Sequence, residues 1–83
     1  MEYVITFEST NLAIKSEKIL TEKAVGKSVM PLPSQIRSGC GICLRVGKES
    51  IEAAEKHLKN AGIKCEIFEQ INGTFTKKKE QDR

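Results

Sequence analysis

Residues 38–47 read SGCGICLRVG, and this stretch decides the fold because it holds the connection in the middle of the chain. Its serine and glycines are residues typical of tight turns. In residues 42–47, apolar Ile, Leu and Val alternate with Cys and Arg, which is the pattern of a half-buried strand. A strand therefore begins just after the turn, and the segments on either side can be assigned outward from it.

The first half of the chain predicts a strand, a helix and an extended edge segment. Residues 2–8 (EYVITFE) are apolar on nearly both faces and rich in β-branched and aromatic residues, which indicates a central strand. A helix over 11–26 follows, with polar N-cap candidates at 9–11. Residues 27–33 (KSVMPLP) are extended, but their prolines cannot donate to a ladder, so they belong at a sheet edge.

The second half predicts a helix, a last strand and a tail. Residues 48–62 place apolar side chains on one helical stripe and end in a glycine cap. Residues 63–71 (IKCEIFEQI) alternate as a strand. Residues 72–83 (NGTFTKKKEQDR) have little to bury, which predicts a flexible charged tail.

This β-α-β-β-α-β order predicts an α+β fold of the ferredoxin-like type. The expected architecture is a two-layer sandwich, in which two helices cover one face of a four-stranded antiparallel sheet, built as a single domain over residues 1–71. With right-handed crossovers, the third strand runs antiparallel between the first two. The start of that strand, with Cys40, should then lie near the N-terminus of the first helix, around residues 9–12.

Composition narrows the class of protein. The chain has 83 residues, 39% of them hydrophobic and 30% charged, and no apolar run long enough to span a membrane. Its first residues lack the basic start of a secretory signal. The cysteines number three, which is odd for a disulfide-paired domain, so we expect reduced thiols and a cytoplasmic protein. The net charge of +3 is concentrated in residues 77–83, which argues against nucleic acid as a partner.

The spacing of Cys40 and Cys43 leaves several kinds of site open. In an extended chain, residues three apart are separated by roughly 10 Å, whereas a disulfide needs Cα atoms within about 7 Å. A tight turn through the glycines could shorten this distance, so a Cys40–Cys43 disulfide is not decided. A zinc site needs four ligands. Because Cys65 falls on an apolar strand face and His57 on a helix flank, no metal and no other cofactor is expected.

Cys40 differs from Cys43 because it lies in a connection, between Gly39 and Gly41. Small neighbours leave room for an approaching partner. The helix N-terminus expected nearby, together with Arg37 and Arg45, would favour the thiolate. On the residues alone, a simple turn with Cys40 as a small filler is an equally good interpretation.

The chain resembles the selenium/sulfur carrier-like family of small bacterial and archaeal proteins. The resemblance covers about residues 2–71. Its most specific part is a Pro-x-Pro segment, then Ser-x-Cys-Gly and an aliphatic-Leu-Arg strand. The matching residues are Pro31, Pro33, Ile36, Ser38, Cys40, Gly41, Leu44 and Arg45.

This resemblance implies that Cys40 accepts a sulfur or selenium atom and passes it on. The implied partners are a cysteine desulfurase or another donor, and an acceptor protein, so the chain would act as a carrier rather than as a stand-alone enzyme. Carrier chemistry would use an exposed thiolate, stabilised by Arg37 and Arg45 and hydrogen-bonded by Ser9 and Thr10. Family members often have a small apolar residue in place of Cys43, which would make Cys43 incidental.

Two other functions stay open. The first is a non-catalytic module that binds a small ligand or a protein, including a second copy of the chain as a homodimer. The second is an oxidoreductase that cycles a Cys40–Cys43 disulfide. An exposed, anionic Cys40 supports the carrier, whereas a buried or inert Cys40 supports the module. The pattern does not distinguish sulfur from selenium.

Overall fold

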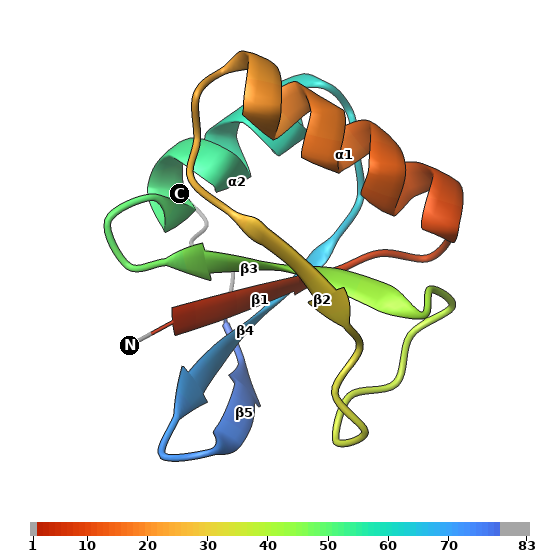
Figure 1. Cartoon of the computed structure of the whole chain (residues 1–83), viewed down its shortest axis with the longest axis vertical. Helices are drawn as coiled ribbons and strands as arrows, with labels where there is room; N and C mark the ends of the chain where they lie inside the picture. Colours follow the sequence, from red (N-terminus) through yellow and green to blue (C-terminus); the bar gives the residue numbers. More distant parts are fainter. Residues whose placement is uncertain (1, 79–83) are drawn as a thin grey trace.

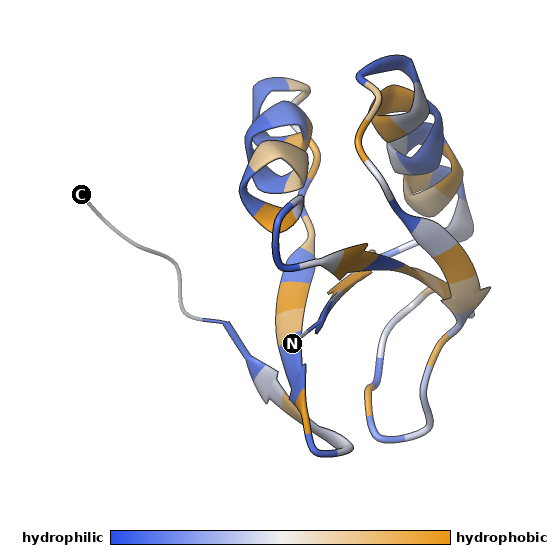
Figure 2. Cartoon of the chain, turned by 60° about the vertical axis from the view of Figure 1, so that its left-hand side comes forward, coloured by the Kyte–Doolittle hydropathy of each residue, from blue (hydrophilic) through white to orange (hydrophobic). Residues whose placement is uncertain are grey.

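A computed structural model describes residues 2–78 of the chain. It contains two helices and five strands, arranged as one sheet with both helices on the same face (Figure 1). Figure 2 shows, from a second direction, the helices on one side of the sheet and the β2–β3 connection and β4–β5 hairpin on the other. The elements are β1 (Glu2–Thr6), α1 (Thr10–Glu22), β2 (Ser28–Pro31), β3 (Ile42–Gly47), α2 (Ile51–Asn60), β4 (Glu66–Ile71) and β5 (Thr74–Lys77).

The sheet has the strand order β2-β3-β1-β4-β5, and every neighbouring pair is antiparallel. β3 therefore lies between β1 and β2, which confirms the predicted placement of the third strand. β1 is central, with Val4 and Ile5 both fully buried on opposite faces. The predicted extended segment with two prolines contains β2, which ends at Pro31 and lies at the sheet edge as predicted. The α+β class with two helices on one antiparallel sheet is confirmed.

The predicted number of four strands is wrong, because residues 74–77 form a fifth. Ile71 pairs with Thr74 across a two-residue turn made by Asn72 and Gly73, whose φ values are 51° and 79°. Positive φ at both positions is the geometry of the hairpin turn that Asn-Gly favours. Phe75 then packs against the sheet. The Asn-Gly hairpin signal was present in the sequence, but so few apolar residues follow it that no strand was predicted there. Residues 79–83 of the predicted tail lie outside the described residues.

The core has two parts, one on each face of the sheet. The larger lies between the sheet and the helices, where Leu20 and Leu58 are fully buried. The smaller lies on the opposite face and is formed by Val4, Ile36 and Cys43, with partly buried side chains around them. The sheet is thus apolar on both sides near its centre. Of the helices in residues 2–78, neither is long and apolar enough to cross a membrane.

Candidate functional site

The connection between β2 and β3, residues 32–41, carries the candidate site and is called the Cys40 loop below. It begins as a continuation of the strand pairing, since the Leu32 N–H donates to the Gly41 carbonyl at 3.0 Å. Ile36 is buried against Val4 and Cys43, on the sheet face that the helices leave uncovered. The loop therefore crosses that face and returns to the start of β3.

Cys40 lies at the N-terminus of α1, where the strand topology predicted it. Its Sγ is 3.7 Å from Thr10 Oγ1, and the Ile42 N–H donates to the same Sγ at 3.4 Å. In the thiol form the S–H donates to the Thr10 oxygen; in the thiolate form the Thr10 hydroxyl can donate in return. The sulfur thus has one N–H donor and one hydroxyl group within contact distance, at the first turn of α1.

Cys40 is nevertheless buried, with 2% of its surface exposed, so the prediction of an exposed thiol is wrong. The reason is the fold of the loop. The sulfur turns back toward the backbone of Ile42 and joins the core between sheet and helices. Gly39 and Gly41 on either side are both exposed, and so is Thr10. The residues on either side of Cys40 are therefore at the surface, while its own side chain lies in the core.

The glycines beside Cys40 have different roles. A Cβ on Gly39 would lie 2.1 Å from the carbonyl oxygen of Glu8, so only glycine allows the loop to pack against the end of β1. A Cβ on Gly41 would have no atom within 4 Å. We expected both glycines to leave room for a partner. At Gly39, the glycine is instead required because the loop backbone packs closely against the Glu8 carbonyl.

Ser9 and Arg37 stand near Cys40 in the chain or the fold, but no contact joins them to its sulfur in residues 2–78. Ser9 is the N-cap of α1, and its hydroxyl accepts from the Leu12 N–H at 3.3 Å. Arg37 is exposed, without an ion pair to any described side chain. Of the predicted supporting groups, Thr10 alone touches the sulfur.

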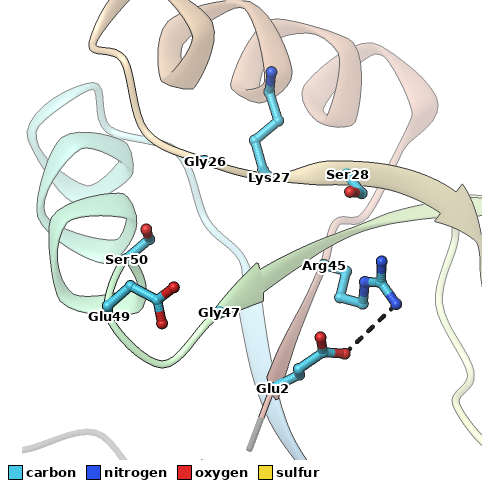
Figure 3. Close-up of a pocket in the computed structure, with 8 residues that line it drawn as sticks. All are labelled: Glu2, Gly26, Lys27, Ser28, Arg45, Gly47, Glu49 and Ser50. Atoms are coloured by element: carbon cyan, nitrogen blue, oxygen red, sulfur yellow. Dashed lines mark ion pairs between the residues drawn. The ribbon is translucent and has the colours of Figure 1, made fainter.

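Arg45 lies away from Cys40, and its predicted role beside the thiolate is wrong. It pairs with Glu2 at 3.5 Å on the sheet face opposite the helices. Both side chains line a small polar pocket at the start of β1 (Figure 3), whereas the Cys40 loop contacts Phe7 and Glu8, beyond the other end of that strand. Side chains alternate between the two faces along β3, so Arg45 lies on the same face as Cys43. Cys40 instead joins the core on the helix side, and this separates it from Arg45.

Cys43 is fully buried on the outer face of the sheet, as predicted for a strand position facing away from the helices. Its Sγ is 3.7 Å from the carbonyl oxygen of Pro31. Burial, and to a smaller extent the charge of a nearby Cys40 thiolate, raise the pKa of Cys43 from 9.0 to about 11. Cys43 therefore stays a neutral thiol at physiological pH and is a poor nucleophile.

This raised pKa predicts a pH dependence of stability. Between pH 9 and pH 11 the Cys43 thiol ionises in the unfolded chain but stays protonated in the folded one. The unfolded state then binds fewer protons, so the free energy of unfolding falls as the pH rises, by at most about 2 kcal/mol from this group. Denaturant unfolding from pH 8 to pH 11 should show a shallower decline for Cys43→Ala than for the wild type. Parallel curves for the two proteins would contradict the prediction.

Residues 2–78 contain few side chains placed to bind a metal ion. Cys40 and Cys43 are buried cysteines that form no disulfide, and Cys65 is half-buried. Across residues 2–78, no three His, Cys, Asp or Glu side chains come together in a way that could hold a metal ion.

Comparison with known families gives this thiol a context. A sequence model of the family described as "Putative Se/S carrier protein-like" matches residues 2–69. The chain belongs to this family. The match spans β1 to β4 and includes the whole Cys40 loop, so the carrier family is defined over the part of the fold that positions Cys40. No curated protein and no solved structure gave a match.

Sequence reasoning missed two residues of the site in this carrier family member. Ser38 Oγ donates to the Phe7 carbonyl and accepts from the Cys40 N–H at 3.3 Å. Glu8 contributes through its backbone carbonyl, against which Gly39 packs. Ser38 could have been singled out as the serine of the Ser-x-Cys motif, but no sequence signal marks a carbonyl oxygen as a contact.

Proposed function

We propose that the chain carries a sulfur or selenium atom on Cys40. The observation that supports this best is the placement of the Cys40 sulfur between the Ile42 N–H and Thr10, at the N-terminus of α1, in a member of the carrier family. The thiolate is the form that attacks a persulfide, and the Ile42 N–H and the Thr10 hydroxyl are the donors that would hydrogen-bond it. We include a ferredoxin-like fold in this proposal. In that fold β3 lies between β1 and β2, and this placement brings Cys40 to the N-terminus of α1.

The transfer step needs no oxidant. The Cys40 thiolate attacks the outer sulfur of a persulfide on a donor protein such as a cysteine desulfurase. A new S–S bond forms on Cys40, the S–S bond of the donor breaks, and its electron pair leaves with the donor's cysteine as a thiolate. The same attack by an acceptor thiolate then removes the atom from Cys40. A perselenide would react by the same steps, and a reducing compartment such as the cytoplasm would keep the thiol free.

The experiment that tests this proposal is persulfide loading. The chain is incubated with a cysteine desulfurase and cysteine, and the mass of each cysteine-containing peptide is measured. Cys40→Ser is expected to lose the sulfur that the wild type gains on residues 38–45, because Cys43 is buried as a neutral thiol; sulfur on the half-buried Cys65 is measured separately on its own peptide. Cys43→Ser is the matched control and should keep most of the loading. Equal loading of Cys40→Ser and the wild type would show the proposal to be wrong.

Burial of Cys40 favours a second candidate, a binding module in which Cys40 only packs. The two functions differ in the reactivity of the folded protein. A carrier must uncover Cys40 while the rest of the chain stays folded, whereas a packing residue reacts only after global unfolding. The two functions can be distinguished by measuring how fast iodoacetamide alkylates Cys40 at several urea concentrations below the unfolding transition. An alkylation rate that does not depend on urea indicates local opening and favours the carrier.

A further inference from the structure

The Cys40 loop is held closed by very few polar contacts. Among the described residues, positions 37–40 make no backbone-to-backbone hydrogen bond with any other part of the chain. The next such bond is at Gly41, which accepts from Leu32 at the base of the loop. This segment is therefore held by side chains: Cys40 is held through its buried sulfur, and a separate tie joins the loop to β1.

Ser38 supplies that tie. Its hydroxyl donates to the carbonyl oxygen of Phe7, at the end of β1, and accepts from the N–H of Cys40. We call these two hydrogen bonds the Ser38 latch. One links the loop to the sheet, and the other fixes the backbone of the residue that bears the sulfur. Gly39 allows the arrangement, because its missing Cβ lets the loop lie against the Glu8 carbonyl.

The latch is at the surface although the sulfur is not. Ser38 and Gly39, together with Phe7 and Glu8, line a broad open groove that continues along α2 and residues 62–67. Cys40 is not among the residues that line it. A protein that docks in this groove can therefore touch the latch before it can reach the thiol.

We propose that Ser38 is a positioning residue, whose latch holds the Cys40 thiol closed and must be released before the thiol reacts. The proposal rests on the function proposed above and adds how access to that site is regulated. A persulfide on a buried sulfur is shielded from stray thiols, so a carrier gains from a loop that opens only at its partners. Opening needs the release of the Ser38–Phe7 hydrogen bond, and the Cys40 sulfur then has to leave its contacts with Thr10 and Ile42 and its place in the core.

The test is the rate at which iodoacetamide labels each cysteine of the folded protein. Cys40 and Cys43 share the tryptic peptide 38–45, so the label is assigned to one or the other from fragment-ion masses. The labelling rate of a buried thiol is proportional to the fraction of molecules in which it is open. Ser38→Ala should label Cys40 roughly five- to tenfold faster than the wild type, the change expected when a partly buried hydrogen bond is lost. Cys43, which is buried in the sheet, should label at an unchanged rate.

Three controls make the result specific. Ser38→Thr keeps the hydroxyl and should return Cys40 toward the wild-type rate. Ser34→Ala removes an exposed serine of the same loop, whose hydroxyl contacts only Gln35 at 3.5 Å, and should have no effect. In the wild type itself, Cys40 should label faster than Cys43 below the unfolding transition, a comparison that holds even if Ser38→Ala does not fold.

An unchanged Cys40 rate in Ser38→Ala, or an equal acceleration of Cys40 and Cys43, would overturn the latch. Equal rates for these two cysteines in the wild type would also overturn it. None of these measurements uses a sulfur donor. A chain that shows the latch but takes up no sulfur therefore disproves only the carrier function, whereas a chain that takes up sulfur but shows no latch disproves only this inference.

Discussion

Gly39→Ala is expected to destabilise the folded protein strongly. The new Cβ would lie 2.1 Å from the Glu8 carbonyl oxygen and 3.1 Å from its carbon. Both are backbone atoms between β1 and the N-cap of α1, so they cannot rotate away as a side chain would. Relief requires the Cys40 loop or the β1–α1 junction to move, and we expect a loss of at least about 3 kcal/mol, a large part of the stability of a small domain.

Gly41→Ala is the matched control for this prediction. It lies on the other side of Cys40, is also exposed, and would place its Cβ in open space. Its free energy of unfolding should stay within about 0.5 kcal/mol of the wild-type value. Urea unfolding followed by circular dichroism measures both variants. Similar stabilities for the two would mean that the close packing of Gly39 on Glu8 is not a feature of the folded protein.

Leu20→Ala is expected to cost about 2–5 kcal/mol, the second large effect. Leu20 is fully buried on the face of α1 that packs in the core between helices and sheet. Truncation removes contacts and leaves a cavity that the rigid sheet below cannot close. In a chain of this size the remaining stability would be marginal. The thermal midpoint and the urea midpoint should both fall sharply.

Ile14→Ala tests whether the Leu20 effect comes from burial. Ile14 is on the same helix, is also a large aliphatic side chain, and is 56% exposed. Its replacement should change the free energy of unfolding by less than about 0.5 kcal/mol, since alanine also has the better helix propensity. A large loss from Ile14→Ala would indicate that the exposed face of α1 is covered in solution, for example by a second copy of the chain.

Most of the fold followed from local patterns. The alternation in residues 42–47 and the apolar run in 2–8 predict β3 and the central strand β1, because burial on one or both faces of a sheet selects those patterns. The helices followed from caps and periodicity in the same way. The fifth strand was missed because a single aromatic, Phe75, anchors it, although the turn at Asn72 and Gly73 carried the usual hairpin signal.

The candidate site was predicted in part. Strand order is a global property that a β-α-β-β-α-β pattern restricts strongly, and it placed Cys40 at the start of α1 before any contact was known. Which side chains meet the sulfur was harder to predict. Thr10 reaches it, whereas Arg45 turns to the other face and Ser9 is used as a helix cap. Which side chain contacts the sulfur depends on the direction of each side chain and on the other partners available to it. Neither can be read from the position of a residue in the sequence.

The sequence by itself determined that this chain has an α+β fold, that it belongs to the carrier family, and that Cys40 differs from Cys43. Periodicity and motif spacing are local properties, and they survive without coordinates. The tertiary structure alone decided that Cys40 is buried, that Gly39 is required by a carbonyl oxygen, and that Ser38 ties the loop to β1. Each of these depends on backbone atoms about thirty residues away in the chain, and only folding brings them within contact distance.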